Sequence, residues 1–461
     1  MNSIGACIKS WRRRAFHCGR RGGVAKKLPL PGSAGTIYDF SHLISALVRR
    51  RWIDPPHPVG NFFRGLFAML NTVCLLGSAS GRNAGDAALM SGIMEAIDQR
   101  LGRQLLYRIP TLSPAFVRQT YQHNRVEAVS VLPWTGSVKL MGLPAYKAVT
   151  SSDLSLVFDA VLFDRSLYNP MFNFLSSLAW LLPKAKQAGR RVGLYNCGIG
   201  PIKTKAGAEM LAKVCDACDF ITVREQGSAD LLQDLGLAHG KVAVTADAAL
   251  NAPMADNDEI SAIYRRIGFR PNGNILAINI NKYLDTWADQ RGEKIDARAF
   301  IELVAQGIIQ SGIEAPTLLV STYHGDEALT RTLLKRLWAL RPNKPAEMIS
   351  NREIDHFQVK GVLSKVGLLF GMRLHAMILA SSALTPIAGI AYQPKVRHYY
   401  EQLGIADACI SFRDLTAAHL ADFLHENWRK REETRAVLSQ RIANLQRLAM
   451  TAADRVADLD C

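Results

Sequence analysis

A cation and an imidazole lie two residues apart in the segment Gly371-Met-Arg-Leu-His375. Apolar runs, 366–370 and 376–380, flank the segment, and this pattern predicts a turn between a buried strand and a buried helix. Open α/β sheets bind their ligands in such turns, at the carboxyl ends of the strands. The guanidinium of Arg373 can hold an anionic group, and an imidazole such as that of His375 suits proton transfer near neutral pH. In an extended segment the two side chains would point to the same side and converge on one ligand.

Taken alone, the stretch from Leu368 to Tyr392 is apolar enough for a membrane span. Arg373, His375 and Pro386 lie in its middle, however, and charge in a bilayer core is costly. We therefore predict a strand, a turn and a helix, followed by a second strand over 386–391.

The composition is that of a globular protein with two domains. The chain has 461 residues, of which 48% are hydrophobic and 21% charged, a length natural for two separate cores. Its eight cysteines are scattered, which indicates reduced thiols in a cytoplasm rather than a disulfide framework. Cys215 and Cys218 form a lone Cys-x-x-Cys that we expect to pack in a helix. No cluster has the spacing of metal ligands, so we expect no metal site and no cofactor.

Much of the net charge of +16 lies in residues 1–54, which contain eleven Lys or Arg and two Asp. The pair Arg13-Arg14 is typical of export signals, but no apolar segment follows it, so we predict no export. We expect residues 1–60 to form a basic arm, either a solvated tail or a peripheral contact with anionic lipid at the inner face of the cell membrane. Nucleic-acid binding is disfavoured because the arm has few aromatic side chains to stack on bases.

Strand-like and helical segments alternate along the chain after the arm. The strand-like runs are 66–76, 154–163, 191–197, 220–223 and 242–245, then 275–280, 317–321, 366–370 and 386–390. Polar breaks at 251–259 and 270–274 separate the two groups. This alternation predicts an α/β protein with two Rossmann-like, doubly wound domains facing a cleft, at 61–255 and 270–412. The helical, charged segment 413–461 can pack back over the first domain.

Five short motifs occur in order along the two predicted domains. They are Asn83-Ala-Gly-Asp86, Val223-Arg-Glu-Gln-Gly-Ser228, Val244-Thr-Ala-Asp247, Met372-Arg-Leu-His375 and Tyr392-Gln-Pro-Lys395. The series resembles the polysaccharide pyruvyl transferase family, whose fold is similar to that of GT-B glycosyltransferases, over roughly residues 68 to 410. One departure is the segment Val157-Phe-Asp-Ala-Val-Leu-Phe-Asp164, where family members commonly carry a glycine pair.

The resemblance implies that phosphoenolpyruvate is the donor and that a sugar or lipid-linked oligosaccharide is the acceptor. It assigns Arg224 and Arg373 to the donor's carboxylate and phosphate, which guanidinium groups bind bidentately. Lys395 is a third cation for the donor. Substrate-binding positions implied in addition are Leu374, Asn83 and Gly85.

The resemblance also implies the residues that move protons. His375 is the general acid, and Asp86 binds the acceptor or acts in acid–base catalysis. Simpler alternatives remain: Asp86 can cap a helix, and Arg224 can form a structural ion pair with Glu225. Asp247 is expected to make a turn or an inter-domain hydrogen bond. The segment 324–326 is a further candidate for the cleft lining.

Three functions fit these residues. The leading one is a cytoplasmic transferase that moves pyruvate from phosphoenolpyruvate onto a sugar hydroxyl pair, as a ketal, in cell-envelope or exopolysaccharide biosynthesis. The second is a GT-B nucleotide-sugar glycosyltransferase, which needs a carboxylate for ribose late in the chain, where Glu401 is the nearest. The third is a binding protein that kept the fold and lost the chemistry.

Overall fold

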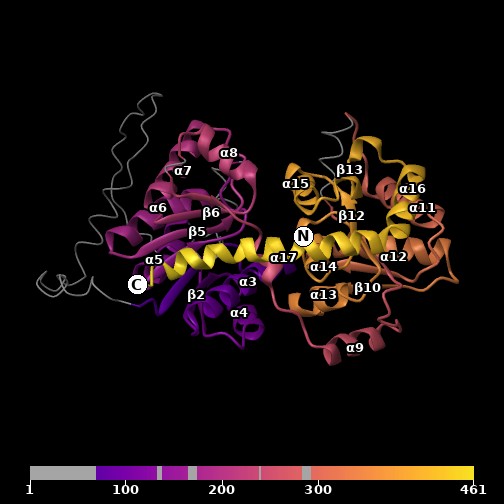
Figure 1. The fold of residues 1–461 in the computed structure, drawn as a ribbon, viewed down its shortest axis with the longest axis horizontal. Helices are drawn as coiled ribbons and strands as arrows, with labels where there is room; N and C mark the ends of the chain where they lie inside the picture. Colours follow the sequence, from indigo (N-terminus) through magenta and orange to yellow (C-terminus); the bar gives the residue numbers. More distant parts are fainter. Residues whose placement is uncertain (1–68, 132–137, 165–173, 238–239, 283–291, 461) are drawn as a thin grey trace, which may run out of the picture. The chain divides into compact units, whose positions relative to one another are not determined.

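The computed structural model describes residues 69–131, 138–164, 174–237, 240–282 and 292–460 (Figure 1). The basic arm predicted at residues 1–60 lies outside the described residues, so its attraction to anionic lipid stays a prediction. The domain boundaries also stay predictions, and the two sheets are described below by their own strands.

The first sheet consists of seven parallel strands in the order β3-β2-β1-β4-β5-β6-β7. We call this sheet and its helices the N-terminal lobe. Its strands are β1 (Thr72–Leu76), β2 (Leu106–Thr111), β3 (Val126–Ser130), β4 (Leu154–Val157), β5 (Arg191–Cys197), β6 (Phe220–Val223) and β7 (Val242–Val244). Its helices are α3 (Ala84–Leu101), α4 (Pro114–Thr120), α5 (Val138–Ser151), α6 (Phe174–Gln187), α7 (Lys205–Ala217), α8 (Gln226–Asp234) and the 3-10 helix η2 (Ala248–Asn251).

The second sheet repeats the pattern with six parallel strands in the order β10-β9-β8-β11-β12-β13. We call it and its helices the C-terminal lobe. Its strands are β8 (Leu276–Asn279), β9 (Thr317–Ser321), β10 (Ala346–Ser350), β11 (Leu368–Gly371), β12 (Ile387–Ile390) and β13 (Cys409–Ile410). The helices that follow η2 in the chain are α9 (Asn257–Arg266), α11 (Ala297–Gln310), α12 (Glu327–Leu340), α13 (His356–Leu363), α14 (Leu374–Ser382), α15 (Pro394–Leu403), α16 (Ala417–Arg429) and α17 (Arg431–Ala457), with the short 3-10 helices η3 (Ala406–Ala408) and η4 (Phe412–Asp414).

Each sheet reverses its strand order beside its first strand, between β1 and β4 and between β8 and β11. Such switch points open a crevice at the carboxyl ends of the strands. Asn83 and Asp86 lie at the start of the helix that follows β1, and Arg373 and His375 lie at the start of the helix that follows β11. The predicted α/β, doubly wound fold class is therefore confirmed, and the two best candidate turns lie at the two switch points.

The strand predictions are right for the buried strands and incomplete at the edges. The strands β2, β3, β10 and β13 were not predicted, because polar residues and Pro110 break up their apolar runs and β13 has only two residues. The strand expected over 154–163 ends at Val157, because Asp159 adopts a left-handed backbone with φ 68°. β1 likewise begins only at Thr72.

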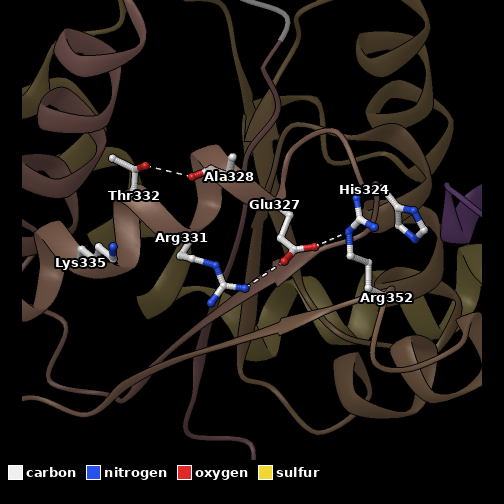
Figure 2. A pocket seen from close by; sticks show the side chains of 7 residues that line it. All are labelled: His324, Glu327, Ala328, Arg331, Thr332, Lys335 and Arg352. Carbon is white, nitrogen blue, oxygen red and sulfur yellow. Dashed lines mark hydrogen bonds and ion pairs between the residues drawn. The ribbon is translucent and has the colours of Figure 1, made fainter. Parts of the chain in front are cut away.

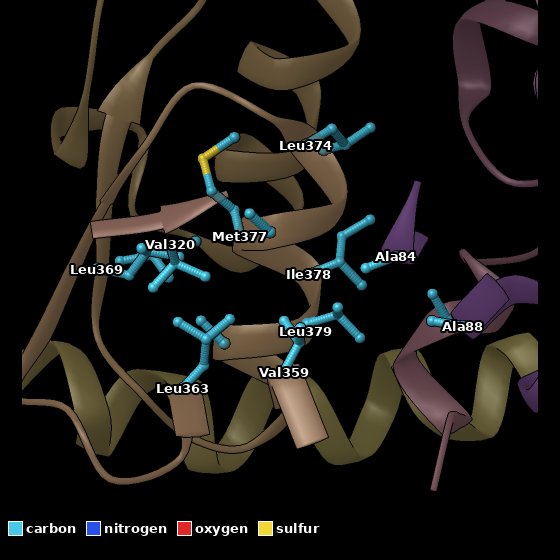
Figure 3. Packing of buried hydrophobic residues seen from close by; sticks show 14 of the residues in the cluster. Ala84, Ala88, Val320, Val359, Leu363, Leu369, Leu374, Met377, Ile378 and Leu379 are labelled. Carbon is cyan, nitrogen blue, oxygen red and sulfur yellow. The ribbon is translucent and has the colours of Figure 1, made fainter. Parts of the chain in front are cut away.

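Helix α14 explains the membrane-like hydropathy around residue 375. A helix that is apolar on every side is buried on every side, and eight of the nine residues of α14 are buried. Figure 3 shows Ile378 and Leu379 of this helix pointing toward Ala84 and Ala88 of α3, while Met377 lies over the strand residue Leu369. No helix within the described ranges is both long and apolar enough to cross a bilayer.

The C-terminal helix α17 contacts both lobes, as Figure 1 shows for the yellow helix. In the N-terminal lobe, the side-chain amide of Asn196 donates to the carbonyl of Ala449 at 3.1 Å. The Arg103 guanidinium pairs with Asp460, just after the helix, at 2.7 Å. The helix also packs on α14 and α15 of the C-terminal lobe. Within the segment after residue 413, α17 packs over the first lobe, as the sequence suggested, whereas α16 packs on α11 of the C-terminal lobe.

Candidate active site

The turn after β1 is fixed to both its own helix and the other lobe. Asn83 caps α3: its side-chain oxygen accepts from the backbone N–H of Gly85 at 3.0 Å, and its amide donates to Asp86 at 2.6 Å. Asn83 is therefore the helix cap, and the alternative that Asp86 caps α3 is wrong. Across the lobes, the backbone N–H of Ala84 donates to the carbonyl of Thr322 at 2.9 Å.

Gly85 allows α3 to approach the imidazole of His375. A Cβ atom placed on Gly85 would lie 2.3 Å from Cβ, Cγ and Nδ1 of His375, far inside van der Waals contact. Only glycine fits this position in the observed packing. The motif residue Gly85 is thus a spacer that brings the first turn of α3 against His375.

His375 begins a chain of polar side chains that ends at the carboxyl end of β6. Its Nε2 lies 3.6 Å from Oδ2 of Asp247, longer than a hydrogen bond but within ion-pair range. The same Oδ2 accepts from Nη1 of Arg224 at 3.0 Å, and Nε of Arg224 pairs with Glu225 at 2.8 Å. The predicted Arg224–Glu225 ion pair is present. Asp247 makes the predicted turn, because its Oδ1 accepts from the backbone N–H of Ala249 at 2.9 Å.

The ionisation of Asp247 follows from these neighbours. Burial by itself would raise the pKa of this carboxyl group, but the adjoining His375 and Arg224 lower it to about 2. Arg224 is almost completely buried, and its pKa is raised because Glu225 and Asp247 outweigh the cost of desolvation. Asp247 is therefore a fixed carboxylate that can orient His375.

Arg373 faces away from this chain. It is the N-cap of α14, where the backbone is still extended, whereas His375 is already inside the helix. The prediction that both side chains leave an extended segment on one side is wrong for this reason. The guanidinium of Arg373 pairs with the buried Asp326 and lies 4.5 Å from the ring centre of Tyr323.

Asp86 and Asp159 form a pair of carboxyl groups at the first switch point, between β1 and β4. The pKa of Asp86 is raised to about 7, first by burial of the carboxyl group and then by the charge of Asp159, against the opposing effect of His375. Asp159 is the residue with left-handed backbone after β4, within the segment that lacks the family's glycine pair. The departure from the family pattern thus places a carboxylate beside Asp86.

This raised pKa predicts a stability effect of Asp86→Asn. Asp86 binds its proton more tightly in the folded chain, so the wild type loses free energy of unfolding as pH rises from about 4 to about 7. An asparagine does not titrate and can still accept from Asn83. We expect the variant to gain about 1–3 kcal/mol over the wild type at pH 7.5 and little at pH 4.

Chemical denaturation at several pH values measures this difference. Asp216→Asn, at an exposed position of α7, is the matched control and should differ from the wild type by a constant amount. A gain that is equal at pH 4 and pH 7.5 would show that Asp86 is not protonated preferentially in the folded protein.

Three of the predicted residues, Arg224, Leu374 and Lys395, line one small pocket. The complete lining is Arg224, Glu225, Asp247, Leu250, Leu374, Ile378, Lys395, His398, Tyr399 and Gln402. We call it the central pocket; its volume is about 20 Å³, room for about one water molecule. The ammonium group of Lys395 has no ion pair among the described residues, and burial together with Arg224 lowers its pKa.

The sequence does not reveal the roles of three carboxylates that organise the site. Asp326 holds Arg373, Asp159 acts on Asp86, and Asp247 joins His375 to Arg224. Asp247 and the segment with Asp326 are candidates from the sequence, but their partners are not. A usable signal for Asp159 was an acidic residue directly after a buried strand, where the resembled family carries glycine.

The two facing, doubly wound sheets define a GT-B-type fold, and solved structures agree. Anabaena Alr3699/HepE, solved with UDP, has a TM-score of 0.55 at 12% identity over 85% of this chain and 99% of its own. The UDP-GlcNAc 2-epimerase of Neisseria meningitidis, solved with UDP-GlcNAc, has a TM-score of 0.55 at 10% identity, over 84% of this chain and 99% of its own. At these identities the likeness concerns the fold alone.

The sequence itself matches the model of a protein family. The model of the family named polysaccharide pyruvyl transferase matches residues 83–394, from the Asn83 cap to the helix that carries Lys395. The chain therefore belongs to the polysaccharide pyruvyl transferase family.

Proposed function

We propose that this protein transfers pyruvate from phosphoenolpyruvate to a pair of sugar hydroxyls, forming a ketal during polysaccharide biosynthesis. The observation that carries the proposal is the convergence of two cations and an imidazole on one place. Arg224 and Lys395 line the central pocket, and His375 adjoins Asp247 in its wall. A small donor that carries both a carboxylate and a phosphate presents one anionic group to each of two such cations.

The residues divide the proposed reaction between them. His375 donates a proton to the terminal enol carbon, so that the neighbouring carbon becomes electrophilic. A sugar hydroxyl adds to that carbon, the bond to the phosphate oxygen breaks, and the second hydroxyl closes the ketal. One hydroxyl proton restores His375 and the other leaves with the phosphate. Asp86, with its pKa raised to about 7, can accept the proton of the attacking hydroxyl and pass it to the departing phosphate.

Binding of the donor requires movement. Phosphoenolpyruvate is larger than the central pocket of about 20 Å³, so side chains of the two lobes must separate to admit it. The wall formed by α15 supplies Lys395, His398 and Gln402. Closure around the donor would then exclude water from the reacting carbon, as hydrolytic loss of pyruvate must be avoided.

The glycosyltransferase alternative lacks support at the residue it requires. A nucleotide-sugar donor needs a carboxylate for ribose, and Glu401 was the nearest candidate. Glu401 is exposed on α15 and is absent from the lining of the central pocket. The proposal therefore keeps phosphoenolpyruvate as the donor.

Calorimetric titration with phosphoenolpyruvate, UDP-glucose and GDP-mannose tests the donor. We expect phosphoenolpyruvate to bind most tightly, and Lys395→Gln to weaken it about tenfold by removing a charge-assisted contact. Arg397→Gln is the matched control, because Arg397 lies on the same helix but bonds the carbonyl of Cys409 at 2.9 Å. Tighter binding of either nucleotide sugar would overturn the assignment.

A further inference from the structure

A second cavity, separate from the central pocket, lies on the C-terminal lobe. It has a volume of about 510 Å³, within the range of ligand sites. Its lining is His324, Glu327, Ala328, Arg331, Thr332, Lys335 and Arg352 (Figure 2). We call it the α12 groove, because five of these residues lie on that helix. It shares no residue with the central pocket.

The α12 groove is positively charged, and two of its cations are held in place. Figure 2 shows Glu327 between Arg331 and Arg352, with ion pairs of 2.9 Å and 2.7 Å. Ser350 donates a further hydrogen bond to Glu327 at 3.1 Å. One carboxylate thus orients two guanidinium groups without neutralising both of them.

Lys335 adds a third cation at the far end of the groove. It follows Arg331 by four residues, so both lie on the same face of α12. Lys335 is exposed and has no ion pair among the described residues. Counting Glu327, these side chains leave the groove with about two unpaired positive charges, while burial and Arg352 lower the pKa of His324 and keep it neutral.

The groove begins beside the candidate active site. The backbone N–H of His324 donates to the carbonyl of Arg82 at 2.9 Å, one residue before the Asn83 cap. The side-chain amide of Asn351 donates to the carbonyl of Gly81, the residue before Arg82, at 3.4 Å. Asp326, two residues beyond His324, holds Arg373. A ligand in the groove therefore lies next to the turn that carries Asp86.

We propose that the α12 groove binds the diphosphate of a diphosphate-linked sugar acceptor. A diphosphate diester carries two negative charges, equal to the surplus of the groove, and guanidinium groups bind phosphate bidentately. Lipid carriers and nucleotide carriers present this same group. The acceptor role rests on the proposed function, whereas diphosphate binding rests on the groove alone.

Calorimetry with inorganic pyrophosphate on the full chain tests the groove directly. We expect the double variant Arg331→Gln/Lys335→Gln to bind pyrophosphate about tenfold more weakly than the wild type. Arg336→Gln is the control, because Arg336 lies on the same helix but pairs with Glu302 at 2.6 Å. Its affinity should stay within about twofold of the wild type. Equal affinity of the double variant and the wild type would overturn the proposal.

Two further titrations separate the carriers and the two proposals. UDP-GlcNAc and a detergent-solubilised polyprenyl-diphosphate-GlcNAc are titrated against the same variants, and the carrier whose affinity falls in the double variant is the one the groove takes. A fall for neither overturns the proposal. Phosphoenolpyruvate, titrated in parallel, should bind the double variant as tightly as the wild type. Loss of pyrophosphate binding with no phosphoenolpyruvate binding in any variant would support the groove and sink the proposed donor.

Discussion

His375→Gln should reduce turnover on the order of 10²–10⁴-fold, the usual contribution of a general acid, while phosphoenolpyruvate affinity stays within about threefold. Affinity is expected to persist because Arg224 and Lys395, rather than His375, supply the cations of the central pocket. A glutamine retains a donor near Asp247 but does not act as an acid. Single-turnover rates measured beside donor affinity separate the two effects.

The control for this variant is His123→Gln. His123 is exposed and lies in the lining of neither cavity, so its loss should change turnover little. Normal turnover of His375→Gln would mean that the imidazole is structural. The proton would then come from elsewhere, and Asp86 is the next residue to replace.

Gly85→Ala should lower turnover on the order of 10²-fold and the free energy of unfolding by about 1–3 kcal/mol. The new Cβ would lie 2.3 Å from the backbone-anchored Cβ of His375, so α3 and α14 must move apart. Rotation of the imidazole alone cannot relieve this contact. A small displacement of His375 from the substrate is enough to slow a positioned proton transfer.

Turnover and thermal unfolding of Gly85→Ala measure both effects. Gly227→Ala is a matched control in helix α8, where the added Cβ would lie 3.7 Å from His398, an ordinary contact. That variant should be neutral or slightly stabilising, because alanine favours helix more than glycine. If Gly85→Ala behaves like Gly227→Ala, the close approach of α3 to His375 is not required.

The hydropathy pattern of the sequence was enough to predict the buried strands and helices that carry the candidate site. The apolar runs around His375 predicted β11 and α14, and the small residues before Asp86 predicted the turn into α3, because a buried strand and a buried helix are legible in hydropathy. The doubly wound architecture followed from the alternation of such segments. Edge strands such as β3, which are half exposed, lack this signal.

The partners of the site residues were not predictable in the same way. Arg373 and His375 are two residues apart, yet one pairs with Asp326 and the other adjoins Asp247, each far away in the sequence. The start of α14 at Leu374 decides this division, because a later start would leave both side chains on the same side of an extended segment. Burial of Asp86 beside Asp159 likewise depends on where two separate strands end.

Helix α17 determines when the N-terminal lobe can complete its packing during translation. The ribosome makes α17 after every strand of both sheets, yet Asn196 at the end of β5 bonds its Ala449 carbonyl, and Leu70 bonds Asp460 just beyond it. The first lobe therefore leaves the exit tunnel with part of its interior surface uncovered. That surface stays uncovered while some 200 further residues are synthesised, roughly 10–40 seconds. Until α17 has been made, the nascent chain exposes apolar surface of the kind that chaperones bind.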